Sequence, residues 1–169
     1  MLSLTEKDIR SSFINASRKE VSDMTLPLDF DAITWDRLDF FGWRDRKMPR
    51  RAYVTLRRGG VLVSILLQQA EALPRARVLC SWCQDITLAD DVVFYGVKRA
   101  GAAGRKGNTI GTLVCADFGC SINARKLPAV AYLGFDVKAA REKQIVGLQE
   151  RVSRFVDDVG VGPDAVEIP

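Results

Sequence analysis

The sequence contains no histidine. Because histidine is the commonest general acid or base in enzymes, its absence removes the usual catalytic relays. Long apolar runs are missing too: the best, residues 61–67, has the length of a strand and falls far short of the about 20 residues of a membrane span. Charged residues follow Met1 within a few positions, so no signal peptide is indicated. We therefore expect a cytoplasmic protein without a membrane segment.

Nucleotide-binding loops are absent as well. Glycines recur between Gly101 and Gly107, but they lack the Gly-Lys-Ser/Thr ending and the strand-to-helix context of a phosphate-binding loop. Carboxylate pairs such as Asp90-Asp91 are typical of solvated turns and helix ends. The sequence thus indicates a protein that is not an enzyme and has no small-molecule substrate.

Cysteine is scarce, but its four copies are arranged in two pairs. Cys80 and Cys83 form a C-x2-C motif, and after a gap of 31 residues Cys115 and Cys120 form a C-x4-C motif. Four thiolates supply the closed tetrahedron of a structural zinc site, which leaves no open position for catalysis. We interpret the pattern as one structural Zn2+ site per chain.

Two other interpretations of the cysteines are open. Four cysteines allow two disulfides in three connectivities, although disulfides rarely persist in a reducing cytosol. A redox C-x-x-C motif built on Cys80 and Cys83 would contain a reactive thiolate, but it would leave the second pair unexplained.

The length and charge are those of one ordinary soluble domain. At 169 residues the chain can bury a hydrophobic core, so zinc need not be its sole source of stability. The net charge of +4 is a modest excess that favours an acidic partner.

The N-terminal half combines a helix with a hairpin. Ser3 and Glu6 have the spacing of a capping box, and apolar residues follow at helical intervals. Gly59-Gly60 lies between two β-prone runs and suits a tight turn. The expected elements are a helix over residues 4–18, a turn at 26–31, and hairpin strands at 52–56 and 61–65.

The two cysteine pairs bracket a second hairpin. The expected elements are a short strand at 75–79, strands at 91–99 and 109–114 joined by a flexible basic loop at 101–108, a short helix at 118–126 that carries the last cysteine, and a long amphipathic helix at 136–159. Knuckle, hairpin and ligand-bearing helix in this order make a treble clef. The N-terminus of the short helix favours the negative zinc–thiolate centre.

The fold expected is α+β: an N-terminal helix, β-hairpins, a treble-clef four-cysteine zinc finger and a long C-terminal amphipathic helix. The expected segments are the N-terminal helix, aromatic and basic stretch and first hairpin at 1–74, the zinc finger at 75–135, the C-terminal helix at 136–159 and a disordered tail at 160–169. Residues 1–159 are expected to form one compact domain.

Aromatic and basic side chains are interleaved in residues 35–51. This mixture is enriched at protein interfaces and at nucleic-acid surfaces. The alternative is that Trp35, Leu38, Phe40 and Trp43 cover the core while the charges are solvated. Both interpretations are open.

Several motifs resemble those of the FBP-domain proteins. They are Gly42-Trp43-Arg44-Asp45 with Tyr53, the C-x2-C knuckle, the run from Gly101 to Arg105, and above all GTLVCADFGCSINAR from Gly111 to Arg125. That family is related to the C-terminal treble-clef zinc-binding domain of the fusidic-acid-resistance proteins that bind elongation factor G. The resemblance implies that the four cysteines are zinc ligands, and that the protein is bacterial, cytoplasmic and docks on elongation factor G, on or near the ribosome.

We therefore expect a non-enzymatic, zinc-binding protein associated with translation. Basic side chains would meet an acidic surface on elongation factor G or ribosomal RNA, and a large apolar side chain would anchor the contact. The candidate contact residues are Arg44, Arg46, Arg50, Arg105, Lys106 and Arg125, with Trp82 or Phe118 as the anchor. One alternative is an RNA-binding zinc-finger module that uses the same side chains, and a second is a thiol redox protein that uses Cys80 and Cys83.

Overall fold

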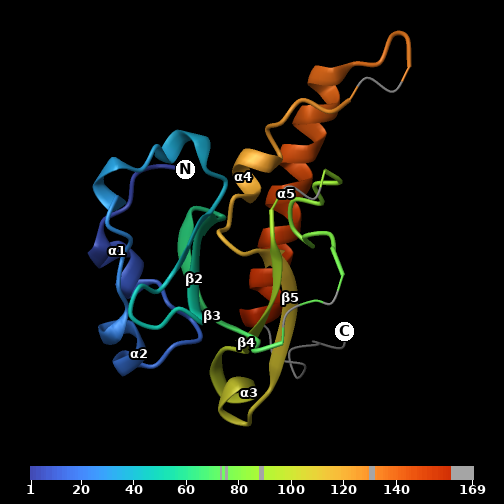
Figure 1. Ribbon diagram of the computed structural model, residues 1–169. Coiled ribbons are helices and arrows are strands. Elements are labelled where there is room, and N and C mark those ends of the chain that lie inside the picture. The colour runs from blue at the N-terminus through green and yellow to red at the C-terminus, as the bar shows by residue number, and fades with distance from the viewer. Residues whose placement is uncertain (73, 75, 88–89, 130–131, 161–169) are drawn as a thin grey trace, which may run out of the picture.

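The computed structural model describes residues 1–72, 74, 76–87, 90–129 and 132–160 (Figure 1). Its elements are α1 (Glu6–Ser11), α2 (Arg18–Asp23), the 3-10 turns η1 (Phe30–Ala32) and η2 (Trp35–Arg37), β1 (Phe41–Arg44), β2 (Arg51–Arg58), β3 (Val61–Gln69), β4 (Val92–Lys98), α3 (Gly101–Arg105), β5 (Thr109–Cys115), α4 (Cys120–Asn123) and α5 (Val137–Gly160). Within this part of the chain no helix is long and apolar enough to cross a membrane.

The strands form one antiparallel sheet in the order β1-β2-β3-β4-β5. At the turn between β2 and β3, Gly59 and Gly60 have φ angles of 54° and 85°, which is the positive φ that the expected hairpin required. β3 and β4 pair through Gln68 and Gln69, at the end of β3. The sheet therefore consists of a β1-β2-β3 part and a β4-β5 hairpin that are joined over a short stretch.

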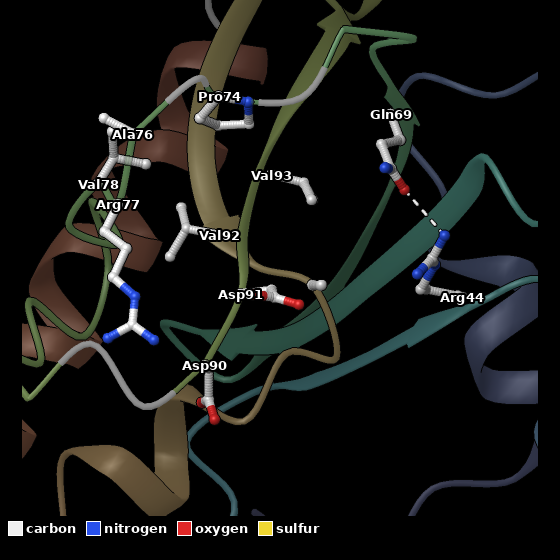
Figure 2. A pocket seen from close by; sticks show the side chains of 11 residues that line it. Arg44, Gln69, Pro74, Ala76, Arg77, Val78, Asp90, Asp91, Val92 and Val93 are labelled. Carbon is white, nitrogen blue, oxygen red and sulfur yellow. Dashed lines mark hydrogen bonds between the residues drawn. The ribbon is translucent and has the colours of Figure 1, made fainter.

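Side-chain contacts reinforce the sheet beyond its ladders. The guanidinium of Arg44 on β1 donates to the Gln69 side chain on β3 at 2.9 Å, across the end of β2 (Figure 2). It also donates to the carbonyl oxygen of Pro49, at 2.9 Å. Arg44 thus holds the edge strand in place.

The single helix expected over residues 4–18 is wrong. The chain forms two short helices instead, each with its own capping box, and the first box begins at Thr5 rather than at Ser3. The second box begins at Ser17. Both helices are six residues long, so neither would persist in isolation.

The break between α1 and α2 has a physical cause in β3. The part of β3 that is not paired with β4 leaves a free edge, and this edge forms hydrogen bonds with the residues between the two helices. The Ile14 amide donates to the Ser64 carbonyl at 3.0 Å, and the Ser64 amide donates to the Ser12 carbonyl at 2.8 Å. The Asn15 side chain then exchanges hydrogen bonds with the backbone of Leu66, at 2.8 and 3.0 Å. These hydrogen bonds take the place of those that a continuous helix would form, so the helix is interrupted.

The remaining elements follow the expected order with two corrections. Among the described residues of the 75–79 segment there is no strand, because its backbone is not paired with the sheet there. The 101–108 segment is not a flexible loop, because it contains α3. The second hairpin, the short helix that carries Cys120 and the long C-terminal helix are confirmed, although the short helix spans Cys120–Asn123 rather than residues 118–126. The expected disordered tail lies outside the described residues except for Gly160, which ends α5.

The sheet lies between two layers of helices. In Figure 1, α5 covers one face of the sheet and α1 and α2 lie on the other side. The described part of the chain has two hydrophobic clusters, and β2 contributes to both. Ala52, Val54 and Leu56 pack in the cluster that contains the four cysteines and residues of α5, called the cysteine cluster below. Tyr53 packs in the other, the N-terminal cluster. The architecture is the expected α+β fold.

Candidate metal centre

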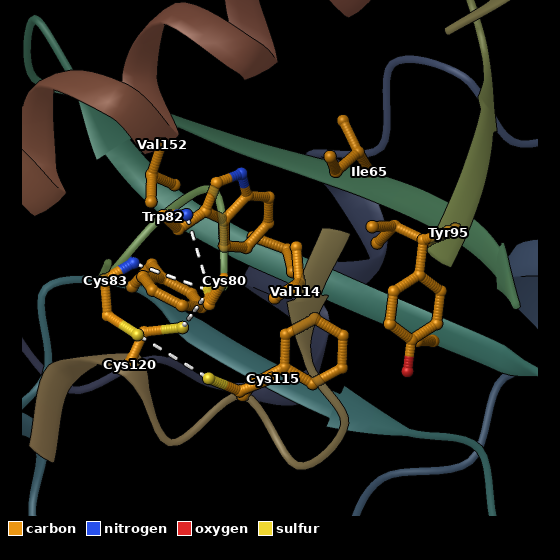
Figure 3. Packing of buried hydrophobic residues seen from close by; sticks show 14 of the residues in the cluster. Ile65, Cys80, Trp82, Cys83, Tyr95, Val114, Cys115, Cys120 and Val152 are labelled. Atoms are coloured by element: carbon orange, nitrogen blue, oxygen red, sulfur yellow. Dashed lines mark hydrogen bonds between the residues drawn. The ribbon is translucent and has the colours of Figure 1, made fainter. Parts of the chain in front are cut away.

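The four cysteines are brought together from three places in the fold. Cys80 and Cys83 lie in the turn after residue 79, Cys115 ends β5 and Cys120 begins α4. All four are buried, and their sulfur atoms all lie within 4.8 Å of one another (Figure 3). The spacing that suggested one four-thiolate site therefore corresponds to one cluster in space.

The distances distinguish a metal site from disulfides. Cys80 Sγ lies 3.6 Å from Cys120 Sγ, and Cys83 Sγ lies 3.6 Å from Cys115 Sγ. A disulfide requires an S–S distance of about 2.05 Å. Thiolates bound to zinc at about 2.3 Å, at the corners of a tetrahedron, lie about 3.8 Å apart. The cluster has the dimensions of a tetrahedral zinc site.

The electrostatics of the bare cluster also favour a cation. Contacts with Cys115, Cys120 and Cys83 lower the pKa of the Cys80 thiol. Contacts with Cys115, Cys80 and Cys83, together with burial, raise the pKa of the Cys120 thiol. The crowded thiols therefore cannot all ionise by themselves. A divalent, thiophilic ion such as Zn2+ would let all four cysteines become thiolates, so the donor set fits that ion.

The knuckle uses backbone hydrogen bonds to orient its first sulfur. The amides of Trp82 and Cys83 both point at Cys80 Sγ, at 3.4 Å each. Gln84 closes the turn with a φ of 53°, in the left-handed region. This is the tight turn that a C-x2-C pair requires.

The second pair is shaped by a strained residue between its two ligands. Phe118 has a φ of 56°, which reverses the chain between β5 and α4. Its ring packs over Gly42 of β1, where an added Cβ would lie 2.6 Å from Phe118 Cγ. The ring also contacts Tyr95, with centroids 5.4 Å apart. Phe118 thus connects the metal loop to both parts of the sheet.

Sequence reasoning missed two residues beside the cluster, Asn123 and Asp90. Asn123 Nδ2 lies 3.8 Å from Cys83 Sγ and 3.7 Å from Cys115 Sγ, and it donates to Asp90 Oδ2 at 2.5 Å. The asparagine occurs in the motif that follows Cys120, but nothing in that motif shows that Asp90 approaches it from a distant loop.

There is almost no free space beside the sulfur atoms. The cavity bounded by Cys80, Cys83, Cys115 and Asn123 has a volume of about 10 Å³. That volume holds no substrate, and a closed four-thiolate site offers no coordination position for one. The geometry is that of a structural centre.

The expected contact residues divide into exposed and buried groups. Arg46, Arg50, Arg105 and Lys106 are exposed, and Arg50 forms an ion pair with Glu71. These four side chains are available at the surface.

Two other expected contact residues have structural partners. Arg44 is partly buried in the hydrogen bonds with Pro49 and Gln69 described above. Arg125 pairs with Asp39, a buried carboxylate that also accepts a 2.7 Å hydrogen bond from Gln149. Both arginines stabilise the fold, so their availability to a partner is limited.

The two expected apolar anchors need correction. Trp82 is 2% exposed and Phe118 is 6% exposed, and both belong to the core cluster of the cysteines. Their rings pack against other aromatic side chains, so neither offers a surface to a partner. Three aromatics of the 35–51 segment are likewise core residues, because Phe40, Phe41 and Trp43 are buried, whereas Trp35 is half-buried.

Comparison with protein families agrees with this geometry. A family model described as the FBP C-terminal treble-clef zinc-finger matches residues 8–159. A solved structure of the fusidic acid resistance protein FusC is similar, with a TM-score of 0.46, 15% sequence identity and coverage of 69% of this chain and 57% of that chain. The matched part thus spans little more than half of FusC. A comparison with curated proteins found no match. With a family match over nearly its whole described length and a buried four-cysteine cluster, the chain belongs to the FBP C-terminal treble-clef zinc-finger family.

Proposed function

We propose that this chain is a non-enzymatic binding protein of the translation apparatus, held together by one structural Zn2+ and docking on elongation factor G. The observation that carries the proposal is the FBP-family match over residues 8–159, which includes all four cysteines. The closed and buried thiolate cluster supports a structural role for the metal rather than catalysis.

The surface at α3 supports a contact with an acidic partner. Arg105 ends α3 and the adjacent Lys106 is its C-cap; both are exposed, whereas Ala103 of the same helix is buried. In Figure 1, α3 lies at the opposite end of the molecule from the first turns of α5. Charges presented on a fixed helix steer association and set its salt dependence.

A calorimetric titration of the zinc-replete protein into elongation factor G of the same organism tests the proposal. We expect one-to-one binding at micromolar or tighter affinity, measured near physiological salt. No heat at two temperatures would remove elongation factor G as the partner, and a titration with ribosomes or ribosomal RNA would then decide between the remaining translation partners.

A double charge reversal tests the surface. Arg105→Glu with Lys106→Glu should weaken binding at least tenfold at low salt and flatten its salt dependence, because two attractive charges become repulsive. The matched control is Lys138→Glu with Lys143→Glu, which makes the same charge change on exposed positions of α5. Equal effects from the two variants would show that net charge, and not the α3 surface, governs binding.

A further inference from the structure

The four sulfur atoms of the metal centre have unequal hydrogen-bond environments. Cys80 Sγ accepts from two backbone amides of its own turn, those of Trp82 and Cys83. Cys83 Sγ and Cys115 Sγ instead share one side-chain donor, the Nδ2 of Asn123, at 3.8 and 3.7 Å. The hydrogen bonding of Cys83 Sγ and Cys115 Sγ therefore depends on one side-chain amide, which a single substitution can remove.

The position of Asn123 is fixed by its burial, its place in α4 and a hydrogen bond to Asp90. It is 7% exposed and lies in the last turn of α4, three residues after Cys120. Its side-chain amide carries two N–H groups. Asp90 Oδ2 accepts from Nδ2 at 2.5 Å, which leaves the second N–H for the sulfur pair. The carboxylate thus fixes which way the amide faces.

A hydrogen bond to a metal-bound thiolate withdraws electron density from sulfur. It makes that sulfur a poorer nucleophile and steadies its orientation toward the ion. A buried amide next to a negative thiolate centre is also favourable in itself, because a partnered polar group costs little to bury.

We infer that Asn123, oriented by Asp90, is a positioning residue of the metal centre that shields the thiolates of Cys83 and Cys115 and slows loss of the ion through them. The inference rests on the zinc assignment of the proposed function, but it does not depend on the identity of the protein partner. In the folded holoprotein Cys83 and Cys115 are then protected by the side chain, and Cys80 is protected by the backbone.

Metal release and cysteine labelling test the inference together. Asn123→Ala should transfer zinc to a competing chelator about tenfold faster than the native protein, in line with the effect of residues that orient metal ligands. During release, a thiol-alkylating reagent followed by mass spectrometry should label Cys83 and Cys115 earlier than in the native protein, while labelling of Cys80 keeps its place. A purely structural loosening would advance all four cysteines equally, and that result would overturn the inference.

Asp90→Ala keeps the test decisive if Asn123→Ala fails to fold. Asp90 is exposed, so its substitution leaves the core untouched. We expect the same order of labelling with a smaller acceleration, because the amide remains but loses its orientation. Asn108→Ala, at an exposed asparagine after α3, is the control and should match the native protein. Native labelling order in the Asp90 variant would contradict the role assigned to that carboxylate.

Cobalt substitution gives a readout that is independent of any partner. The sulfur-to-cobalt charge-transfer band should shift in Asn123→Ala, because the thiolates lose a hydrogen bond, and remain unchanged in Asn108→Ala. An unchanged band together with native release rates would reject the inference even where binding of elongation factor G is intact. Absence of elongation factor G binding by the native protein, together with a shifted band in Asn123→Ala, would reject the proposed partner alone.

Discussion

Asp45 shows how one carboxylate can organise a segment that the sequence marks only as charged. It is 2% exposed and accepts hydrogen bonds from the Thr25 backbone and hydroxyl, from the Lys47 and Met48 amides, and from the Tyr53 hydroxyl at 2.8 Å. Burial acts to raise the pKa of Asp45, but the hydrogen bonds from Thr25, Tyr53, Met48 and Lys47 outweigh it and lower the pKa below its usual 3.8. Burial and Asp45 together raise the pKa of Tyr53. Asp45 therefore ties the N-terminal segment to β1 and β2.

Asp45→Asn should lower the free energy of unfolding by about 2 kcal/mol, because buried donors lose a charged acceptor. The lowered pKa means that the carboxylate stabilises the fold above its unfolded pKa of about 3.8, and that this stability is lost as the pH falls through the lower folded pKa. Urea unfolding at pH 7 and at successively lower pH measures both effects. The difference between native protein and variant should shrink below pH 4 because Asp45 becomes protonated there. Acid release of the metal affects both proteins alike and cancels in this difference. A constant difference would exclude the ionised carboxylate as the cause.

The residues of the metal centre differ in how visible they are in the sequence. Four cysteines in two close pairs could be predicted as one site, because ligand spacing is a local property. Asn123 and Asp90 could not be predicted as partners, because they lie 33 positions apart in the sequence and only tertiary folding brings them into contact. The same holds for Trp82 and Phe118: an aromatic side chain next to a ligand is compatible with a surface anchor or with the core, and only tertiary packing decides.

At the scale of elements, the N-terminal helix was predicted wrongly for a reason that the sequence does not display. The apolar spacing of residues 4–18 suits one helix, but the free edge of β3 offers Ser64 and Leu66 as hydrogen-bond partners to the residues between α1 and α2. Both hairpins, in contrast, were predicted correctly, because turn glycines and β-prone runs are local signals. The error arose where a long-range pairing competed with a local preference.

Gly42 is the point at which β1 and the metal loop meet, and Gly42→Ala tests that connection. The added methyl group would lie 2.6 Å from Phe118 Cγ and 2.7 Å from Phe118 Cβ, so the ring must move. We expect a loss of about 1–3 kcal/mol in unfolding free energy, the usual cost of overpacking a core. Because Phe118 lies between Cys115 and Cys120, chelator-driven zinc release should accelerate as well.

The matched control is Gly96→Ala, a strand glycine at which an added Cβ would meet the Gln68 carbonyl oxygen at 3.9 Å, an ordinary contact distance. It should change stability by less than 1 kcal/mol, about the scale of strand preferences. Equal destabilisation by the two alanines would show that the cost reflects glycine in a strand rather than displacement of Phe118.

At the scale of the whole molecule, the two hydrophobic clusters share one strand. The cysteine cluster contains Leu148, Val152, Val156 and Val159 of α5, which cover the same strand whose opposite face holds Tyr53. The ladder between β3 and β4 is short, and the cysteine cluster, which includes residues of α5, adds contacts between the β4-β5 hairpin and the rest of the sheet. The four cysteines therefore belong to the same buried core as the sheet and α5.

This arrangement predicts a single cooperative unfolding transition in the zinc-bound protein. Trp82 lies in the cysteine cluster, whereas Trp35 and Trp43 belong to the N-terminal cluster, so Trp82→Phe leaves tryptophan fluorescence as a reporter of the N-terminal cluster. In the cobalt-substituted Trp82→Phe protein, the thermal midpoint of the cobalt–thiolate absorption should coincide with that of the fluorescence, because β2 cannot lose one face without exposing the other. Cys83→Ser should abolish the absorption and lower the fluorescence midpoint as well, since metal binding is coupled to folding. Two separate midpoints, or a fluorescence midpoint unchanged by Cys83→Ser, would show that residues 1–74 fold independently of the zinc finger.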